Sequence, residues 1–217
     1  MKPRTDILPS AQQEIWPQLA AGDLPLVLYG GTAIALHLGH RVSVDFDFFC
    51  SVPLDKVKVR SRFGFMRGAT VLQDSEDTLV ARAAMPSGPV KVSFFGAIDI
   101  GRINDPLRTD DSVMLIASLE DLLATKLKTI LDRAEAKDYV DISAMLSAGV
   151  SLERALGAFA KMYDNDPAQP LKAMGFFNDG DLRSLSPKDR EILRVARDNV
   201  TDVPPVSLLD GLCPQGG

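Results

Sequence analysis

The chain has 217 residues, enough for one large domain or for a domain with a smaller helical appendage, and its 46% hydrophobic and 24% charged residues exclude wholesale disorder. Two cysteines without metal-ligand spacing, and the lack of an apolar run near the roughly 20 residues of a membrane span, argue against a membrane partner and favour a reducing cytoplasm. The net charge of −5 argues against broad electrostatic binding of nucleic acid but leaves room for a local basic groove.

The first segments predict helices that alternate with strands. Ser10 can cap a helix that runs to about Ala20 and that Pro17 bends or divides. The short apolar run Leu26–Tyr29 predicts a buried strand, and the segment Ala33–Leu38 predicts a helix that Gly39 ends. The sequence therefore predicts a strand, a turn and a helix, in this order, as its first structural unit.

The next strand, expected at residues 45–49, carries two acids. Because side chains alternate between the faces of a strand, Asp45 and Asp47 share one face, while Val44, Phe46 and Phe48 take the other and suit a core. Alpha carbons two positions apart on a strand are roughly 6.5 Å apart. Carboxylates with this spacing can share one or two Mg²⁺ ions.

The turn before the helix offers a binding site for a phosphate. Gly30, Gly31 and Thr32 place free backbone N–H groups at the positive end of the helix dipole. Arg41, after the helix, could clamp a phosphate, and it could equally neutralise Asp45 as a plain ion-pair partner. A phosphate site beside metal-binding carboxylates is the equipment for moving a nucleotidyl group.

A basic stretch follows between Pro53 and Thr70, where helix is expected as far as about Phe63. It holds one acid and five basic residues, namely Lys56, Lys58, Arg60, Arg62 and Arg67. At i, i+4 spacing these side chains form either a solvated helix face or one edge of a groove for a polyanion.

The remaining sequence changes from strands to helices. Strands are expected at Thr70–Gln73, Thr78–Arg82 and Val90–Phe95, and Val113–Ile116 is either another short strand or a lead-in segment. Helices are expected after Ser118, at Lys137–Ser147, after Ser151 and at Pro187–Val200. Asp164–Pro170 reads as a polar linker, and the tail from Thr201 is expected to fray. We therefore predict an α+β protein, with a mixed sheet flanked by helices over residues 1–112 and a helical region with a flexible tail over residues 113–217.

Two motifs carry a family resemblance that covers roughly Leu26 to Leu146. The segment GGTAIALHLGHRVSVDFDFF resembles the signature of the AbiEii/AbiGii toxin family of nucleotidyltransferases. The segment SLEDLLATKLKTILDRAEAKDYVDI is similar to the second motif of that family, a helix with a lysine followed by Lys/Arg-Asp-x-x-Asp. The resemblance implies a nucleotidyltransferase-like fold.

The resemblance also implies roles for residues of the first motif. Gly30 and Gly31 would form the phosphate-binding turn, and the hydroxyl of Thr32 would meet a phosphate oxygen. Asp45 and Asp47 would bind the catalytic metal ions.

In the second motif, the resemblance implies that Lys126 meets the triphosphate and that Asp138 and Asp141 complete the site. Lys126 lies beside the apolar stripe of its helix and could instead be a surface lysine that covers apolar neighbours. The two aspartates, at i and i+3, could pair with Lys137 or Arg133, or could orient Lys126 and a substrate hydroxyl.

One position departs from the pattern of many nucleotidyltransferases, which carry a third acid on a later strand. The cleft-facing positions expected on the matching strand are Lys91 and Ser93, and neither is acidic. Either Asp45 and Asp47 suffice, or another acid contributes, or catalysis is weak; the candidates for another acid are Asp74, Asp77 and Asp99.

The leading hypothesis is a Mg²⁺-dependent nucleotidyltransferase that moves a nucleoside monophosphate from an NTP to a hydroxyl. The resemblance implies an RNA acceptor such as the 3′ end of a tRNA, and a cognate antitoxin in a type IV toxin–antitoxin system. Two alternatives stay open: a non-catalytic module that binds nucleotide, and an enzyme that modifies a small hydroxylated molecule.

Overall fold

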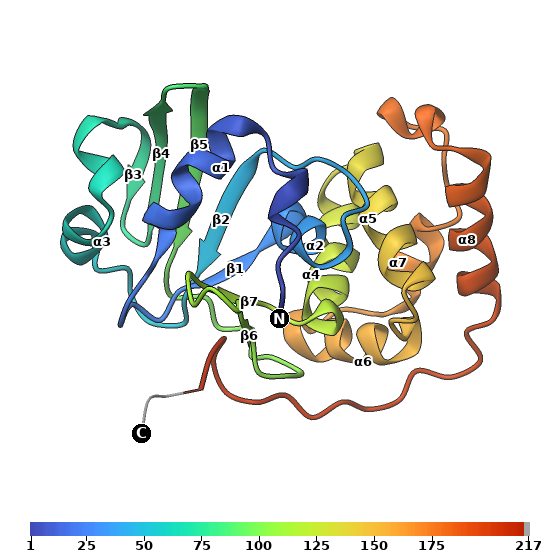
Figure 1. The fold of residues 1–217 in the computed structure, drawn as a ribbon. Coiled ribbons are helices and arrows are strands. Elements are labelled where there is room, and N and C mark those ends of the chain that lie inside the picture. Colours follow the sequence, from blue (N-terminus) through green and yellow to red (C-terminus); the bar gives the residue numbers. More distant parts are fainter. Residues whose placement is uncertain (215–217) are drawn as a thin grey trace. The chain divides into compact units, whose positions relative to one another are not determined.

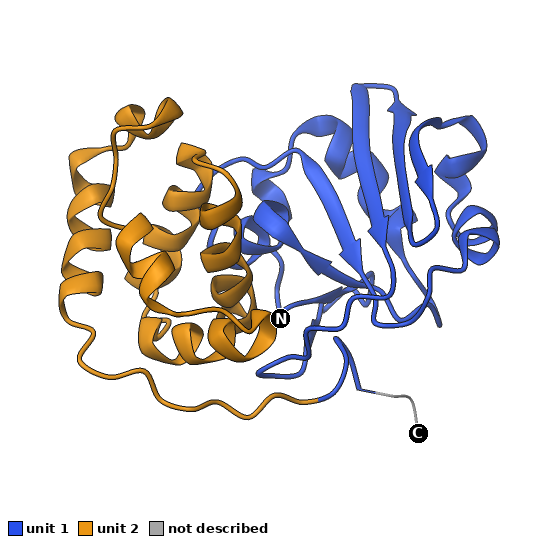
Figure 2. Cartoon of the chain, turned by 180° about the vertical axis from the view of Figure 1, so that it is seen from behind, with its two compact units in different colours: residues 1–117, 210–217 blue, residues 118–209 orange. Residues whose placement is uncertain are grey.

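The computed structural model describes residues 1–214, which form two compact units. Residues 1–117 and 210–214 make the first unit, and residues 118–209 make the second (Figure 2). The first unit holds the sheet together with α1 (Ser10–Ile15), α2 (Gly30–Leu38) and α3 (Lys56–Arg62). The helices of the second unit are α4 (Leu119–Asp132), α5 (Ala136–Ser147), α6 (Leu152–Tyr163), α7 (Ala168–Ala173) and α8 (Pro187–Asp198).

Within residues 1–214 the sheet has seven strands in the order β3-β4-β5-β2-β1-β7-β6 (Figure 1). In chain order they are β1 (Val27–Tyr29), β2 (Asp45–Phe49), β3 (Thr70–Ser75), β4 (Thr78–Met85), β5 (Gly88–Phe95), β6 (Leu107–Arg108) and β7 (Leu115–Ile116). Strand β2 runs antiparallel to β1 and parallel to β5, and the predicted mixed sheet and α+β class are confirmed. The two-residue strand β6 had no recognisable sequence pattern.

One face of β2 and β5 forms the core of the first unit. Phe46, Phe48 and Phe94 are fully buried, and burying each such side chain contributes about 1.5–3 kcal/mol. The ring of Phe63 stacks on Phe48 and Phe94, so the segment after α3 covers this face. The expectation for Val44 was wrong: it is 59% exposed, because β2 begins at Asp45 and the alternation does not extend back to residue 44.

Two helix boundaries near the N-terminus follow from Pro and Gly chemistry. Helix α1 ends at Ile15, and a 3-10 turn over Trp16–Leu19 contains Pro17, so the predicted division of this helix is confirmed. Helix α2 begins at Gly30, three residues earlier than expected, and ends at Gly39, whose φ of 65° lies in the left-handed region.

The helices of the second unit begin with hydroxyl caps. Ser118 Oγ accepts a hydrogen bond from the backbone N–H of Asp121 at 3.1 Å, and Ser151 Oγ accepts one from that of Arg154 at 3.2 Å. The expected linker contains α7, in which Pro170 is buried, so the Asp164–Pro170 assignment was wrong from Ala168 onward. No helix in the described part of the chain is both long and apolar enough to cross a membrane.

Residues 210–212 bind to the first unit, which contradicts for this part of the tail the expectation that the chain frays from Thr201. The end of that tail, residues 215–217, lies outside the described residues. The buried guanidinium of Arg102 donates hydrogen bonds to the carbonyl oxygens of Asp210 and, at 3.1 Å, of Gly211. The backbone N–H of Leu212 donates to Ser51 Oγ at 2.7 Å, and the Leu212 side chain is 1% exposed. A buried arginine thus fixes a segment whose composition suggested disorder.

Candidate active site

The turn from β1 into α2 brings Gly30 against the carboxylate of Asp47. Gly30 has a φ of +74°, a conformation that residues with a Cβ rarely adopt. A Cβ added at Gly30 would lie 3.0 Å from Asp47 Oδ2. Glycine is therefore required both by the backbone and by the closeness of the carboxylate.

The guanidinium of Arg41 lies over Gly31. A Cβ added at Gly31 would lie 2.5 Å from Arg41 Nη2 and 3.0 Å from Ser43 Oγ. The N-cap residue of α2, Tyr29, offers no side-chain cap, and the first N–H groups of a helix have no partner inside it. Helix dipole, backbone N–H groups and a guanidinium therefore converge on a place suited to a phosphate.

Thr32 ties this turn to the carboxylate strand. Its side chain is 1% exposed, and its hydroxyl donates a hydrogen bond to the backbone carbonyl of Asp45. The hydroxyl thus makes a contact inside the protein, and the phosphate contact implied by the resemblance stays a prediction. The bond fixes the distance between the helix N-terminus and β2.

Asp45 and Asp47 lie on the same face of β2, as the alternation predicted, because Phe46 and Phe48 between and beyond them are buried on the other. The Asp45 side chain is 40% exposed, and its Oδ2 lies 3.4 Å from Nζ of Lys91, which is 43% exposed. Lys91, whose pairing with Asp45 sequence reasoning missed, neighbours Asp45 directly in the register between β2 and β5. A long ion pair open to water is weak and exchangeable.

Ser93 lies beside Asp47 in the same register and on the same face. It is 1% exposed, and its Oγ has no hydrogen-bond partner among the described residues. Two of the acids considered as a third ligand are engaged elsewhere: Asp74 pairs with Lys56 at 2.7 Å, and Asp77 Oδ1 accepts a hydrogen bond from the backbone N–H of Leu54 at 2.9 Å. Asp99 is exposed and lies beyond the end of β5.

The donor set fits a Mg²⁺ ion that shares its ligands with a substrate. Residues 1–214 contain no group of three or more His, Cys, Asp or Glu side chains that could hold a metal alone. Mg²⁺ is commonly held by one or two carboxylates together with substrate phosphates and waters. Asp45, Asp47 and the unpartnered hydroxyl of Ser93 suit that mode of binding.

The residues of the second motif form a closed cluster in the second unit. Nζ of Lys126 lies 2.6 Å from Asp138 Oδ1 and 2.8 Å from Asp141 Oδ2, and both aspartates are fully buried. Lys126 itself is 5% exposed, so it is not a surface lysine. The candidate residues therefore fall into two groups, one in each unit.

Arg133 completes this cluster. Its Nε lies 2.8 Å from Asp138 Oδ2, so the suggested pairing with Arg133 is confirmed, whereas Lys137 pairs with Glu135 at 2.6 Å. Burial alone would raise the pKa of Asp138, but the hydrogen bond from Arg133 and the charge of Lys126 outweigh burial and hold the pKa below its usual value. Asp138 is thus a buried carboxylate that stays ionised.

Three of the five basic residues in the stretch on α3 and the turn after it have acidic partners. Lys56 and Arg60 both pair with Asp74, at 2.7 and 2.6 Å, and Lys58 pairs with Asp55 at 3.6 Å. The segment also covers the face of the sheet opposite to Asp45, since Phe63 stacks on Phe48. It provides no edge for a groove at the carboxylates.

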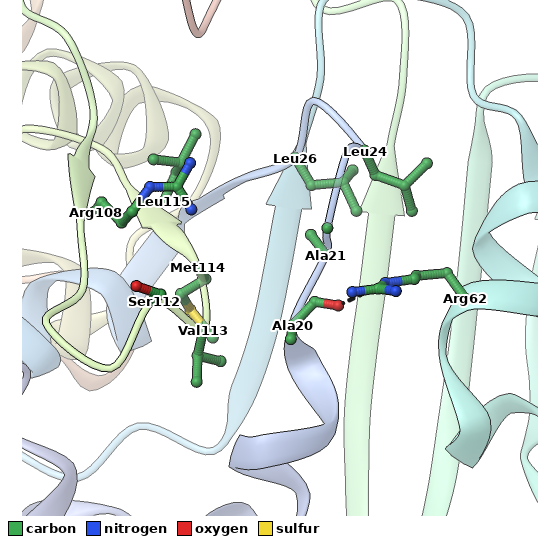
Figure 3. Close-up of a pocket in the computed structure, with 11 residues that line it drawn as sticks. Ala20, Ala21, Leu24, Leu26, Arg62, Arg108, Ser112, Val113, Met114 and Leu115 are labelled. Carbon is green, nitrogen blue, oxygen red and sulfur yellow. Dashed lines mark hydrogen bonds between the residues drawn. The ribbon is translucent and has the colours of Figure 1, made fainter.

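A cavity of about 120 Å³ lies at the far end of β1 (Figure 3). Leu24 and Leu26 line it, and so does Arg62, whose Nε donates a hydrogen bond to the carbonyl of Ala20 at 2.9 Å. Leu26 precedes β1, whereas Gly30 follows it, so this cavity is at the other end of the strand from the candidate site. Its volume is also below the roughly 300 Å³ at which ligand pockets begin.

Solved structures of nucleotidyltransferases have the same fold. The TM-score is 0.56 for a protein from H. pylori assigned as a nucleotidyltransferase, which is 22% identical and covers 87% of this chain and 90% of its own. MenT4, a nucleotidyltransferase toxin from Mycobacterium tuberculosis H37Rv, gives 0.51 at 14% identity, with 85% and 82% covered. An antigenic nucleotidyltransferase-like protein from Paracoccidioides brasiliensis gives 0.50 at 18% identity, with 76% and 94% covered.

Sequence comparison establishes the family. An uncharacterized protein of Aquifex aeolicus (strain VF5) is 30% identical over 156 residues, which are 70% of this chain and 73% of the relative. The family model described as nucleotidyl transferase AbiEii toxin, type IV TA system, matches residues 18–205. The chain therefore belongs to the AbiEii family of nucleotidyltransferase toxins of type IV toxin–antitoxin systems.

Proposed function

We propose that this nucleotidyltransferase transfers a nucleoside monophosphate from an NTP to a hydroxyl of an RNA, with Mg²⁺ held by Asp45 and Asp47. The observation that carries the proposal is the placement of two partly exposed carboxylates on one strand face, with one of them against the glycine turn that opens α2. Phosphoryl transfer needs positioning and charge stabilisation more than covalent chemistry, and these residues supply both.

Each residue of the first unit has a definite task in this proposal. A bound Mg²⁺ supplies positive charge that polarises the phosphate oxygens. The N–H groups at Gly30 and Gly31, with the guanidinium of Arg41, bind the phosphates that leave as pyrophosphate. Thr32 holds this turn at a fixed distance from Asp45 through its hydrogen bond to the backbone.

The second-unit cluster enters the proposal through Lys126. We keep the expectation that Lys126 binds a phosphate, with Asp138 and Asp141 orienting it, as the proposed role of the second motif. The ammonium is held by both aspartates, so contact with a phosphate requires exchange of one of these partners. Lys126→Met separates the possibilities: a raised KM for NTP supports phosphate binding, whereas a lowered Tm with unchanged KM supports a purely structural role.

The family supports a proposal for the acceptor and for the partner. We propose tRNA, at its 3′-terminal hydroxyl, as the acceptor, and an antitoxin encoded with the chain as the regulatory partner. The type IV toxin family and the likeness to MenT4, itself a nucleotidyltransferase toxin, support this assignment.

The test is label transfer to RNA. The protein is incubated with Mg²⁺, each α-³²P-labelled NTP in turn and total tRNA, and the labelled RNA is resolved on a gel. We expect one NTP to label tRNA, with loss of labelling when EDTA replaces Mg²⁺ and when Asp47 is changed to Asn. Equal labelling by wild type and Asp47→Asn, or no labelling with any NTP, would contradict the proposal.

A further inference from the structure

The carboxylate face of the sheet continues beyond Asp45 as a row of cations. The register places Asp45 opposite Lys91 on β5, and Lys91 opposite Arg82 on β4. Neighbouring strands are about 4.8 Å apart, so the row from Asp45 to Arg82 spans roughly 10 Å. Figure 1 shows β2, β5 and β4 side by side in this order.

On β3, β4 and β5 this face carries no acid. The described residues that share it on β3, β4 and β5 include no carboxylate; they are Thr70, Gln73, Ser75, Thr78, Val80, Arg82, Ala84, Pro89, Lys91, Ser93 and Phe95. Asp74 takes the opposite face, where it pairs with Lys56 and Arg60. The charged residues of β4 and β5 on this face are therefore cations only, and they lie between Asp45 and the β3 edge of the sheet.

The pairing of Arg82 with Lys91 is unfavourable for stability. Like charges directly opposite each other on antiparallel strands destabilise a sheet. Lys91 finds partial relief in its long contact with Asp45, but no hydrogen bond or ion pair engages the exposed Arg82 side chain among residues 1–214. A local arrangement that costs stability without a compensating contact is typical of a functional site.

The geometry of the reaction assigns an occupant to this row. In an in-line displacement the attacking and leaving oxygens lie on opposite sides of the phosphorus. In the proposed function the leaving phosphates lie at Gly30 and Gly31, on the β1 side of β2. The acceptor must then approach from the other side of β2, where β5 and β4 carry Lys91 and Arg82.

We infer that Lys91 and Arg82 bind successive phosphates of a single-stranded RNA acceptor and guide its 3′ end to Asp45. The inference rests on the proposed function, because the reaction geometry supplies the direction of approach. Asp45 cannot fully serve both Lys91 and a divalent cation, so Lys91 becomes available to a phosphate when the site is loaded. RNA binding is thereby concentrated in two side chains of an otherwise acidic protein.

The experiment measures RNA binding without metal or nucleotide. A fluorescein-labelled, unstructured single-stranded RNA is titrated with protein, and anisotropy is followed between about 50 and 200 mM NaCl. Each phosphate contact on a single strand contributes about 0.7 to the slope of log K against log salt. We expect Arg82→Gln to weaken binding about fivefold and to reduce the slope by about 0.7.

Arg67→Gln is the matched control. Arg67 is also exposed and loses the same charge, but it lies in the 3-10 segment Gly64–Gly68, which follows Phe63 on the opposite face. We expect this variant to bind RNA like wild type. Thermal melts of both variants verify that they are folded.

Asp45→Asn should strengthen RNA binding, which is the opposite of the effect expected for Arg82→Gln. Removal of the carboxylate releases Lys91, so we expect metal-free RNA binding to tighten several-fold, and we expect this gain to disappear in the Asp45→Asn, Lys91→Gln double variant. A gain that persists in the double variant would show that Lys91 does not receive the RNA.

Three results would overturn the inference: absence of RNA binding by the wild type, equal binding by Arg82→Gln and Arg67→Gln, or an Arg82→Gln defect confined to nucleotide binding. The last would assign the cations to the NTP. Failure of label transfer with intact Arg82-dependent RNA binding would count against the proposed function alone.

Discussion

Two pairs of aspartates, one in each unit, have opposite environments. Asp45 is 40% exposed and meets Lys91 at 3.4 Å, whereas Asp138 and Asp141 are fully buried and hold Lys126 at 2.6 and 2.8 Å. Exposed ion pairs contribute about 0–1 kcal/mol to stability, whereas breaking a buried pair costs about 3–5 kcal/mol. The comparison teaches that Asp45 can exchange its ion-pair partner for a ligand at little cost, whereas Asp138 and Asp141 can release Lys126 only at a large cost in free energy.

The largest expected effect is a loss of nucleotidyl transfer, without a loss of stability, when Asp45 is changed. Asp45→Asn should lower the rate of nucleotidyl transfer by about 10³-fold, because charge stabilisation at the reacting phosphate is lost, while the free energy of unfolding changes by less than about 1 kcal/mol. Steady-state kinetics and urea denaturation measure the two. Asp74→Asn, which removes two exposed ion pairs from the opposite face, should change neither by much. A large loss of stability in Asp45→Asn would mean that the contact of Asp45 with Lys91 is as important for folding as the buried contacts of Asp138.

The buried pair should respond in the reverse manner. Asp138→Asn leaves Lys126 and Arg133 without their shared carboxylate and should lower the free energy of unfolding by about 3–5 kcal/mol. Urea denaturation followed by far-UV circular dichroism measures the change. An Asp138→Asn protein as stable as wild type but without activity would show that the cluster is catalytic and not structural.

A smaller effect tests the closeness of the exposed pair to the glycine turn. Gly30→Ala places a Cβ at a left-handed φ and 3.0 Å from Asp47 Oδ2, so it should cost about 1–3 kcal/mol. Gly149→Ala is the matched control, because Gly149 has a φ of 86° with nothing within 4 Å of an added Cβ. The two variants share the backbone strain. Equal losses of Tm would mean that the Asp47 side chain moves away from the added Cβ at no cost in stability.

The smallest effect is the pH dependence of the stability that Asp138 contributes. Because the native pKa of Asp138 lies below the unfolded value of about 3.9, its contribution to stability is present above that pH and is lost as the pH falls towards the native pKa. Melting curves between about pH 6 and 3 should therefore show a decline that is shallower in Asp138→Asn. Identical declines would mean that other carboxyls dominate acid unfolding.

The sequence was sufficient where one residue determines a local outcome. Pro17 divided the first helix, Gly39 ended α2, and Ser118 and Ser151 capped α4 and α6, because each acts through its own backbone or hydroxyl chemistry. The face shared by Asp45 and Asp47 also followed from strand alternation alone.

The sequence was insufficient where partners lie far apart along the chain. Lys91 is 46 positions from Asp45, and only the parallel register of β2 and β5 brings them together. Asp74 of β3 forms an ion pair with α3, and no local sequence pattern reveals this contact because it depends on how β3 pairs with β4. The basic stretch consequently suggested a groove at the carboxylates, whereas it lies on the opposite face of the sheet and three of its cations are paired.

The hold of Arg102 on the chain after Leu209 has a consequence for synthesis. Residues 118–209 leave the ribosome before the segment that closes the first unit does. The first unit therefore gains these hydrogen bonds only after residues 118–209 have been made. Completion of the first unit thus waits for synthesis of the second unit, which lies between its two parts along the chain.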